Sequence, residues 1–504
     1  MPSSVSSALR LVVAGFVLAR HDALAPREFA HLLPAPARLG ATVMRTLAGG
    51  NRAKGRPGER LARAFEELGP AAVKLGQLLS TRADIFGVEF AEDLTHLKDR
   101  LPPFPLEVAK AEVEAGLGRP LGAMFASFEP PVAAASLAQA HPATLLNGRR
   151  VAVKVLRPGV EKRVFADIGA LHLGAAMADR LAPPLRRLEP RAFATTVARS
   201  LELELDLRLE ASAASELGEV MALTDHMRAP KVIWDGVAKR MLTLEWIDGV
   251  PLSRPEALEQ PGLDRPALAN HVTRGFLSQA LDHGVFHADL HEGNLFVRAP
   301  AVLEAVDFGI VGRLDAAAQR FLAEILWGFI RRDYRRVAEV HFEAGYVPAD
   351  QDVAMFAQAL RAVGEPIFGR PAKEVSMGRL LGQLFEITGL FGMHLRPELV
   401  LLQKTMVAVE GVARRIDPDH DIWTAARPVV ERWMARELSP VRRVRDLAER
   451  GVKAVEVLAR MADTPAPPVI VQPRSSHLGW AGVALGLLAL AVSLASWLHL
   501  LPQP

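Results

Sequence analysis

The sequence of 504 residues predicts an α+β fold of two lobes, with a helical N-terminal extension and a C-terminal transmembrane helix. Three observations carry this prediction. Strand patterns at residues 149–156 and 240–246 flank an acidic helical stretch, which is typical of a small mixed lobe. Helical periodicity dominates residues 251–437 and the first 125 residues. Residues 478–501 contain no Asp, Glu, Lys or Arg.

Changes in pattern divide the chain into five predicted segments. A proline-rich linker at residues 463–468 precedes the apolar C-terminal stretch. The segments are the N-terminal extension at 1–125, the small lobe at 126–250, the large lobe at 251–437, a basic helix with its linker at 438–477, and the transmembrane helix at 478–501.

The composition excludes several kinds of function. The chain has no cysteine, which excludes disulfide bonds and thiol catalysis. Lys and Arg number 60 against 57 Asp and Glu, so the charge balance does not favour a nucleic-acid partner. The length accommodates one core of roughly 300 residues with helical additions.

Two motifs carry the strongest functional signal, His287-Ala-Asp-Leu-His-Glu-Gly-Asn294 and Asp307-Phe-Gly309. In a phosphotransfer site, Asp289 would orient the nucleophile or accept its proton. Asn294 and Asp307 would supply the oxygen ligands that Mg²⁺ prefers. The combination predicts an ATP and Mg²⁺ site in a protein-kinase-like fold.

A single lysine is predicted to hold the phosphates of ATP. Lys154 ends the alternating strand pattern that begins at Val151, where a kinase places this residue. Its expected partner is Glu210, at the end of an acidic stretch that the sequence predicts to be one continuous helix. On such a helix Glu202, Asp206 and Glu210 recur every four residues and share a face. We expect Asp206 and Glu210 to face the nucleotide, and Glu202 to be solvated.

The segment that should cover the phosphates is rich in alanine instead of glycine. Alanine amides can still point at phosphates, but their methyl groups limit how closely the backbone approaches. Nucleotide handling is therefore expected to be atypical. The predicted nucleotide-binding residues are Val132, Ala133, Ala134, Ala135, Ser136, Leu137, Ala138 and Gln139, with Glu245 at the segment where adenine would bind.

The element Lys74-Leu-Gly76-Gln77 lies ahead of the small lobe. Together with the alanine-rich loop, Glu204-Leu-Asp206 and His287-Ala-Asp289, it resembles the UbiB family of atypical kinases from about residue 60 to about residue 435. Two downstream stretches, 332–339 and 401–405, are similar to the bacterial ubiquinone-biosynthesis branch.

This resemblance implies roles for the residues that match. Lys74, Gly76 and Gln77 would belong to a regulatory helical lid over the substrate site, with Glu204 and Asp206 beside it. Glu210 would pair with Lys154, Asp289 would be the catalytic aspartate, and Asn294 and Asp307 would hold the metal. The chain departs from the family by having Leu290 and Glu292 where prolines are usual, which affects the rigidity of the loop more than its chemistry.

The apolar C-terminal stretch predicts the localisation. Its 24 residues span roughly 36 Å as a helix, which exceeds the hydrocarbon core of a bilayer. Basic residues precede it, so a single-pass protein of the bacterial inner membrane with a cytoplasmic catalytic domain is expected. The shorter apolar run at residues 11–19 is interpreted as an uncleaved amphipathic segment.

The expected function is that of an atypical ATP-dependent kinase or ATPase in ubiquinone biosynthesis. By the resemblance, its partners would be the membrane, lipid quinone precursors and other enzymes of the pathway, and its cofactors ATP and Mg²⁺. Two alternatives stay open: a small-molecule or lipid kinase, which the His287–His291 loop also resembles, and a nucleotide-binding scaffold for a biosynthetic complex.

Overall fold

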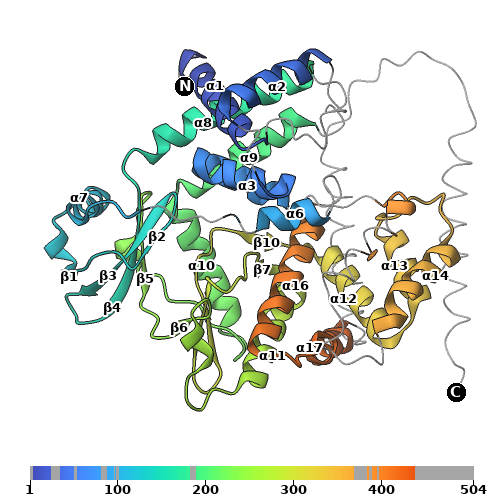
Figure 1. Cartoon of the computed structure of the whole chain (residues 1–504). Helices are drawn as coiled ribbons and strands as arrows, with labels where there is room; N and C mark the ends of the chain where they lie inside the picture. Colours follow the sequence, from blue (N-terminus) through green and yellow to red (C-terminus); the bar gives the residue numbers. More distant parts are fainter. Residues whose placement is uncertain are drawn as a thin grey trace, which may run out of the picture. The chain divides into compact units, whose positions relative to one another are not determined.

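The computed structural model describes most of the chain up to Glu437. The described residues are 4–23, 35–49, 54–80, 88–95, 97, 102–181, 189–367, 383, 384, 387, 389–393 and 397–437. Residues 1–436 form one unit (Figure 1). The predicted segments at 438–477 and 478–501 lie outside the described residues.

The small lobe is built on a five-stranded antiparallel sheet in the order β1-β3-β4-β5, with β2 paired to β3. Val151, Val153 and Val155 alternate along β4 and are fully buried, because β-branched side chains pack well on one face of a pleated strand. The strands are β1 (Phe125–Phe128), β2 (Ala133–Ala134), β3 (Ala138–Leu145), β4 (Arg150–Leu156) and β5 (Met241–Glu245).

Four helices and two short 3-10 turns accompany this sheet. Val113 of α7 packs with the valines of β4 and with Met241 of β5 in one apolar cluster. The elements are α7 (Leu106–Leu117), η3 (Leu121–Ala123), α8 (Val160–Leu181), α9 (Pro190–Glu204), α10 (Leu207–Met221) and η5 (Trp234–Gly236).

The acidic stretch is not the single helix that the sequence predicts. Helix α9 ends at Glu204, and α10 begins at Leu207. Asp206 is the N-cap of α10, and its side chain accepts a hydrogen bond from the backbone N–H of Arg208 at 3.2 Å. An aspartate in this position satisfies a backbone donor that the first turn leaves unpaired. Glu202, Asp206 and Glu210 therefore do not share one helical face.

The large lobe is mainly helical, and two small sheets, β6-β8-β9 and β7-β10, carry the loops of interest. Its strands are β6 (Val250–Pro251), β7 (Val285–His287), β8 (Leu295–Arg298), β9 (Val302–Ala305) and β10 (Val311–Arg313). Its helices and turns are η6 (Pro255–Leu258), α11 (Arg265–Ser278) with its π-helical continuation η7 (Gln279–His283), α12 (Ala316–Arg331), α13 (Tyr334–Glu343), α14 (Val353–Gly364), η8 (Glu365–Ile367), α16 (Pro397–Ile416) and α17 (Ile422–Glu437).

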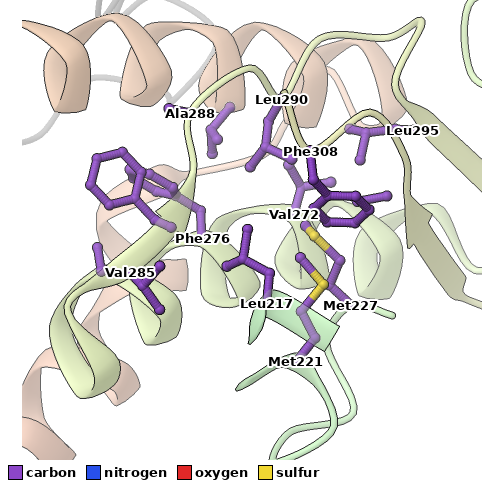
Figure 2. Close-up of a cluster of buried hydrophobic side chains, with 14 of the residues drawn as sticks. Leu217, Met221, Met227, Val272, Phe276, Val285, Ala288, Leu290, Leu295 and Phe308 are labelled. Carbon is purple, nitrogen blue, oxygen red and sulfur yellow. The ribbon is translucent and has the colours of Figure 1, made fainter. Parts of the chain in front are cut away.

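A shared apolar core joins α10 to the large lobe. Figure 2 shows Phe308 near Val272 and Met227 within this core. Phe276 and Phe286 meet edge to face, with ring centroids 5.6 Å apart. Burying one such ring contributes about 2–3 kcal/mol. Because Phe308 follows Asp307 directly, the core fixes the backbone of the predicted metal ligand.

The N-terminal extension consists of helices with an apolar cluster of their own, formed by Phe65, Val73, Leu94 and Leu97 among others. The extension packs on the small lobe, where α1 contacts α8 and α4 contacts α9 (Figure 1). The helices are α1 (Ser4–Arg20), α2 (Ala35–Ala48), α3 (Pro57–Leu68), α4 (Pro70–Ser80) and α6 (Val88–Thr95).

Gly76 allows α4 to approach its neighbours. A Cβ atom at this position would lie 2.3 Å from Leu97 Cδ1 and 2.7 Å from Phe65 Cδ2, which real side chains do not tolerate. The glycine of the Lys-x-Gly-Gln element is thus required by packing.

We expect Gly76→Ala to destabilise the extension by about 1–3 kcal/mol, because overpacking forces its neighbours to move. Gly40→Ala in α2 is the matched control, since nothing lies within 4 Å of the added Cβ, and we expect it to stabilise that helix slightly. Urea unfolding of the two variants tests the difference. If Gly76→Ala and Gly40→Ala were equally stable, α4 would not pack tightly against Phe65 and Leu97.

The predicted transmembrane helix needs correction. No helix in the described part of the chain is both long enough and apolar enough to cross a bilayer. Charged residues interrupt the longest of these helices, α8 and α16, and Arg10 lies in the middle of α1, where it pairs with Asp167 of α8. Residues 478–501 lie outside the described residues. The observed fold class is therefore α+β with two lobes and a helical extension, and the single-pass inner-membrane localisation is not retained.

Candidate phosphotransfer site

Lys154 is the centre of the candidate site. Its neighbours Val153 and Val155 point into the sheet's core, so the lysine points to the opposite face of β4. Its Nζ atom donates to both carboxylate oxygens of Glu210, at 2.7 and 2.9 Å, and to Oδ1 of Asp307 at 3.2 Å. The structure thus brings together three predicted site residues from β4, α10 and the loop after β9.

The three charges shift one another's pKa. Burial lowers the pKa of Lys154, but the charges of Asp307 and Glu210 together raise it above its ordinary value. The charge of Lys154 is the main cause that lowers the pKa of Asp307 to about 2. Burial raises the pKa of Glu210 to about 7, against the opposing charge of Lys154. Lys154 and Asp307 are therefore ionised at neutral pH, while Glu210 titrates there.

The two ion pairs of Lys154 differ in their exposure to solvent. The Glu210 side chain is 10 % exposed, whereas that of Asp307 is 51 % exposed. Water screens the Asp307 pair more strongly, so the bond to Glu210 is the firmer of the two. Asp307 can then turn part of its carboxylate toward another cation.

His287 joins the two predicted motifs. This residue is fully buried, its Nε2–H donates to the carbonyl of Val306 at 3.0 Å, and its Nδ1 accepts from the backbone N–H of Asp289 at 3.2 Å. Burial lowers the pKa of the imidazole and favours its neutral form. Both ring nitrogens are thereby engaged, and His287 positions Asp289 relative to the residue before Asp307.

Asn294 is tied to the same loop. Its side-chain amide donates to the carbonyl of Asp289 at 3.1 Å, and its own carbonyl accepts from Val306 N–H at 2.9 Å. Asp307 has a φ of +61°, a left-handed conformation that few residues other than glycine, asparagine and aspartate adopt readily. The backbone hydrogen bond between Val306 and Asn294 and the left-handed conformation of Asp307 together fix the position of one loop relative to the other.

The residues present fit a magnesium ion. With its amide nitrogen bound to Asp289, Asn294 keeps its side-chain oxygen available, and Asp307 offers an ionised carboxylate. Both are hard oxygen donors, and Mg²⁺ characteristically takes few protein ligands together with phosphate oxygens and water. When bound, the ion would neutralise charge on the phosphates. These metal-binding roles stay predictions.

Contacts with other parts of the chain hold the predicted catalytic loop in place. Leu290 is completely buried in the core near Phe308 (Figure 2), and the carbonyl of Glu292 accepts from Ser253 N–H at 3.1 Å. The carboxylate of Glu292 pairs with Arg415 of α16. Tertiary contacts therefore replace the restriction that the family's prolines would provide.

The alanine-rich segment forms a tight hairpin between β2 and β3. Ala133 pairs with Ala140, and Ala135 N–H donates to the Ala138 carbonyl at 2.8 Å across Ser136 and Leu137. Arg157 secures the turn by donating from Nε to the Ala135 carbonyl at 2.9 Å. Val132 and Ala134 complete the predicted set on β2 and its approach, and nucleotide binding by this hairpin stays a prediction.

The buried side chain of Gln139 faces the N-terminal side of the small lobe instead. Its oxygen accepts from Phe104 N–H at 3.0 Å, and its amide donates to Nε2 of His141 at 2.8 Å. Glu245, at the end of β5, uses its carboxylate to bind Arg149 at 2.7 Å. These are the contacts of the two side chains in this structure, and nucleotide binding by Gln139 and Glu245 stays a prediction.

The predicted lid residues are only partly brought together. Lys74 is buried on α4 and pairs with Glu204 at the end of α9. Burial raises the pKa of Glu204, and the charge of Lys74 opposes that shift. Asp206 binds Arg208 instead, at 2.6 and 2.8 Å. Gln77 lies one turn along α4, half-buried.

Two residues near the site escape prediction from the sequence. Arg157 follows β4 and holds the hairpin, although an arginine after a strand carries no distinctive signal. Lys404 of α16 lies close enough to Asp289 for its charge to affect the pKa of this lysine. The stretch 401–405 carries the family resemblance, yet nothing in its spacing indicates that it approaches Asp289.

Comparison with known proteins identifies the family. Residues 96–341 match the ABC1 atypical kinase-like domain, and residues 360–421 match the UbiB helical domain. A probable protein kinase UbiB from Marinobacter nauticus is 43% identical over 388 residues, which cover 76% of this chain and 71% of that protein. The chain belongs to the UbiB family. The resemblance inferred from the motifs is confirmed.

Further UbiB relatives and one solved structure agree. The probable protein kinase UbiB of Xanthomonas axonopodis pv. citri is 42% identical over 420 residues, covering 81% of this chain and 75% of its own length. The structure of the Rv3197-erythromycin complex from Mycobacterium tuberculosis aligns with a TM-score of 0.50 over 78% of this chain and 97% of that chain, at 23% identity. That likeness supports the kinase-like α+β fold alone.

Proposed function

We propose that this UbiB-family protein is an ATP-dependent atypical kinase or ATPase of ubiquinone biosynthesis. It would act on lipid quinone precursors or regulate other enzymes of that pathway. The observation that carries the catalytic part is the meeting of Lys154, Glu210 and Asp307, since kinases pair a strand lysine with a glutamate to bind the phosphates and place the aspartate of Asp-Phe-Gly nearby to hold Mg²⁺. The assignment to ubiquinone biosynthesis is supported only by the name of the UbiB family.

In this proposal each residue has a definite task. Lys154 would bind phosphate oxygens, with Glu210 holding its ammonium group in place. Asp289, fixed by His287 through its backbone N–H, would orient the attacking hydroxyl or water and accept its proton. Asn294 and Asp307 would hold Mg²⁺.

The position of the helical extension favours a small acceptor or water over a bulky protein. Lys74 of α4 pairs with Glu204, and its charge also acts on Lys404, whose other charged neighbour is Asp289. Lys74 and Asp289 both act on the charge of Lys404, so α4 would lie near the side on which a protein substrate would have to dock. A lipid phenol or a water molecule requires much less space.

The decisive experiment measures phosphate release from γ-labelled ATP by the wild type and by Asp289→Asn, with and without vesicles that contain quinone precursors. We expect Asp289→Asn to lose at least about a hundredfold in turnover. Label in free phosphate would indicate an ATPase, and label in the lipid would indicate a lipid kinase.

Asp315→Asn is the matched control, because Asp315 only caps α12 and asparagine caps a helix equally well. Its turnover should equal that of the wild type. Turnover that is indifferent to Asp289, or absent from the wild type, would refute the proposal and favour a nucleotide-binding scaffold.

A further inference from the structure

Helix α16 is anchored to the catalytic loop at two points. The hydroxyl of Thr405 lies 3.2 Å from the carbonyl of Ala288, one residue before Asp289, and shares its single proton between that carbonyl and the carbonyl of Leu401 at 2.8 Å. About three turns further on, Arg415 pairs with Glu292 in the same loop. Thr405 is buried, so this face of α16 is held in a defined position against the loop.

Lys404 directly precedes Thr405 on α16, and it lies close enough to the predicted catalytic aspartate for the charge of Asp289 to act on it. Its ammonium makes no ion pair with a carboxylate anywhere in the described ranges between residues 4 and 437. The two other lysines of the region differ in this respect, because Lys74 pairs with Glu204 and Lys154 with Glu210.

The charges around Lys404 are of both signs. Burial lowers the pKa of Lys404, Asp289 raises it, and the nearby Lys74 lowers it further. A half-buried ammonium that no carboxylate contacts directly is costly to desolvate, and an anion in direct contact with it would offset that cost. A phosphate group that enters beside Asp289 would supply that anion.

We propose that Lys404 is a second phosphate-binding lysine, which contacts the terminal phosphate of the nucleotide from α16 while Lys154 acts from β4. This inference rests on the proposed function. In the transfer step, the bond between the γ-phosphorus and the β,γ-bridging oxygen breaks, and a bond from the acceptor oxygen to that phosphorus forms. The acceptor's proton passes to Asp289, ADP leaves with the bridging oxygen, and Lys404 stabilises the charge on the transferred group.

Binding affinities separate this role from a structural one. We would measure the affinity of a non-hydrolysable ATP analogue and of ADP, both with Mg²⁺, for the wild type and Lys404→Met by calorimetry. We expect Lys404→Met to weaken the analogue at least about tenfold and ADP by less than about twofold, and to lower kcat by about a hundredfold. Lys404→Arg should recover much of the analogue's affinity.

Val407→Ala, on the exposed side of the same helix, is the control for general damage to α16 and should leave both affinities unchanged. Equal weakening of both nucleotides, or no weakening, would overturn the role of Lys404. If the wild type prefers the analogue through Lys404 but does not turn over ATP, the proposed function fails and the binding site stands. If Lys404→Met turns over ATP as the wild type does, the role of Lys404 fails and the proposed function stands. A wild type that binds neither nucleotide would overturn both.

Discussion

Asp307→Asn is expected to lose Mg²⁺-dependent ATP turnover by a factor of about 10³ or more, while the protein stays folded. Asparagine tolerates the left-handed conformation found at φ +61°, and Phe308 still anchors the backbone, so the geometry should persist. What disappears is the carboxylate that is ionised throughout the neutral range, with a pKa of about 2. A neutral amide binds Mg²⁺ far more weakly.

The loss should be measured as kcat/KM over a range of Mg²⁺ concentrations. The same variant should lower the pKa of Glu210, because the charge of Asp307 is one of the causes that raise it. Asp264→Asn is the control, since Asp264 caps α11 away from the site. Normal turnover in Asp307→Asn would remove this residue from the metal site.

Lys154→Met is expected to affect both activity and stability. Turnover should fall by about a hundredfold or more, because the variant removes the ammonium group that would bind the phosphates. The variant also leaves Glu210 buried without its cation. Breaking such a pair costs about 3–5 kcal/mol when the remaining charge cannot be neutralised.

Lys154→Met should lower the free energy of unfolding more at high pH than at low pH. The pKa of Glu210 is already about 7, above its ordinary value of 4.5, so the folded state binds this proton more tightly than the unfolded state does. The stability linked to it is therefore complete below about pH 4.5 and is lost as the pH rises through about 7. Without Lys154 the pKa rises further, and the loss of stability extends to higher pH.

Urea unfolding at pH 5.5 and pH 8 measures this effect. We expect Lys154→Met to be destabilised more at pH 8 than at pH 5.5, and Lys154→Met/Glu210→Gln to regain stability at pH 8 without regaining turnover. Lys110→Met is the control, because Lys110 only forms a surface pair with Glu107. A destabilisation that is the same at both pH values would mean that Glu210 is not the group left unpaired.

Local spacing predicts the candidate site better than it predicts the elements around it. The motifs at Asp289 and Asp307 depend on short-range turns, and a lysine on a strand has few possible partners, so the pairing with Glu210 follows. The helix break at Asp206 escapes prediction because one capping hydrogen bond outweighs a four-residue repeat of charges. The roles of all these residues in catalysis stay predictions.

Contacts between distant parts of the chain could not be predicted from the sequence. Arg415 and Glu292 are 123 residues apart, and no local pattern relates them. The same holds for Gln139 and Phe104, whose hydrogen bonds turn a predicted nucleotide ligand toward the extension. Hydropathy predicts a transmembrane helix at residues 478–501, which lie outside the described residues, and no helix in the described part is long and apolar enough to cross a bilayer.

The contacts of Thr405 and Arg415 with the loop at Asp289 also indicate how far the functional part of the chain extends. The matched kinase-like domain stops at residue 341, yet Thr405 and Arg415 come from the region after it. A fragment cut at that boundary would keep the motifs at Asp289 and Asp307 and lack two of the supports that hold the predicted catalytic loop. Family boundaries drawn on sequence thus divide what the tertiary structure joins, and the smallest active piece of this protein should extend through α16.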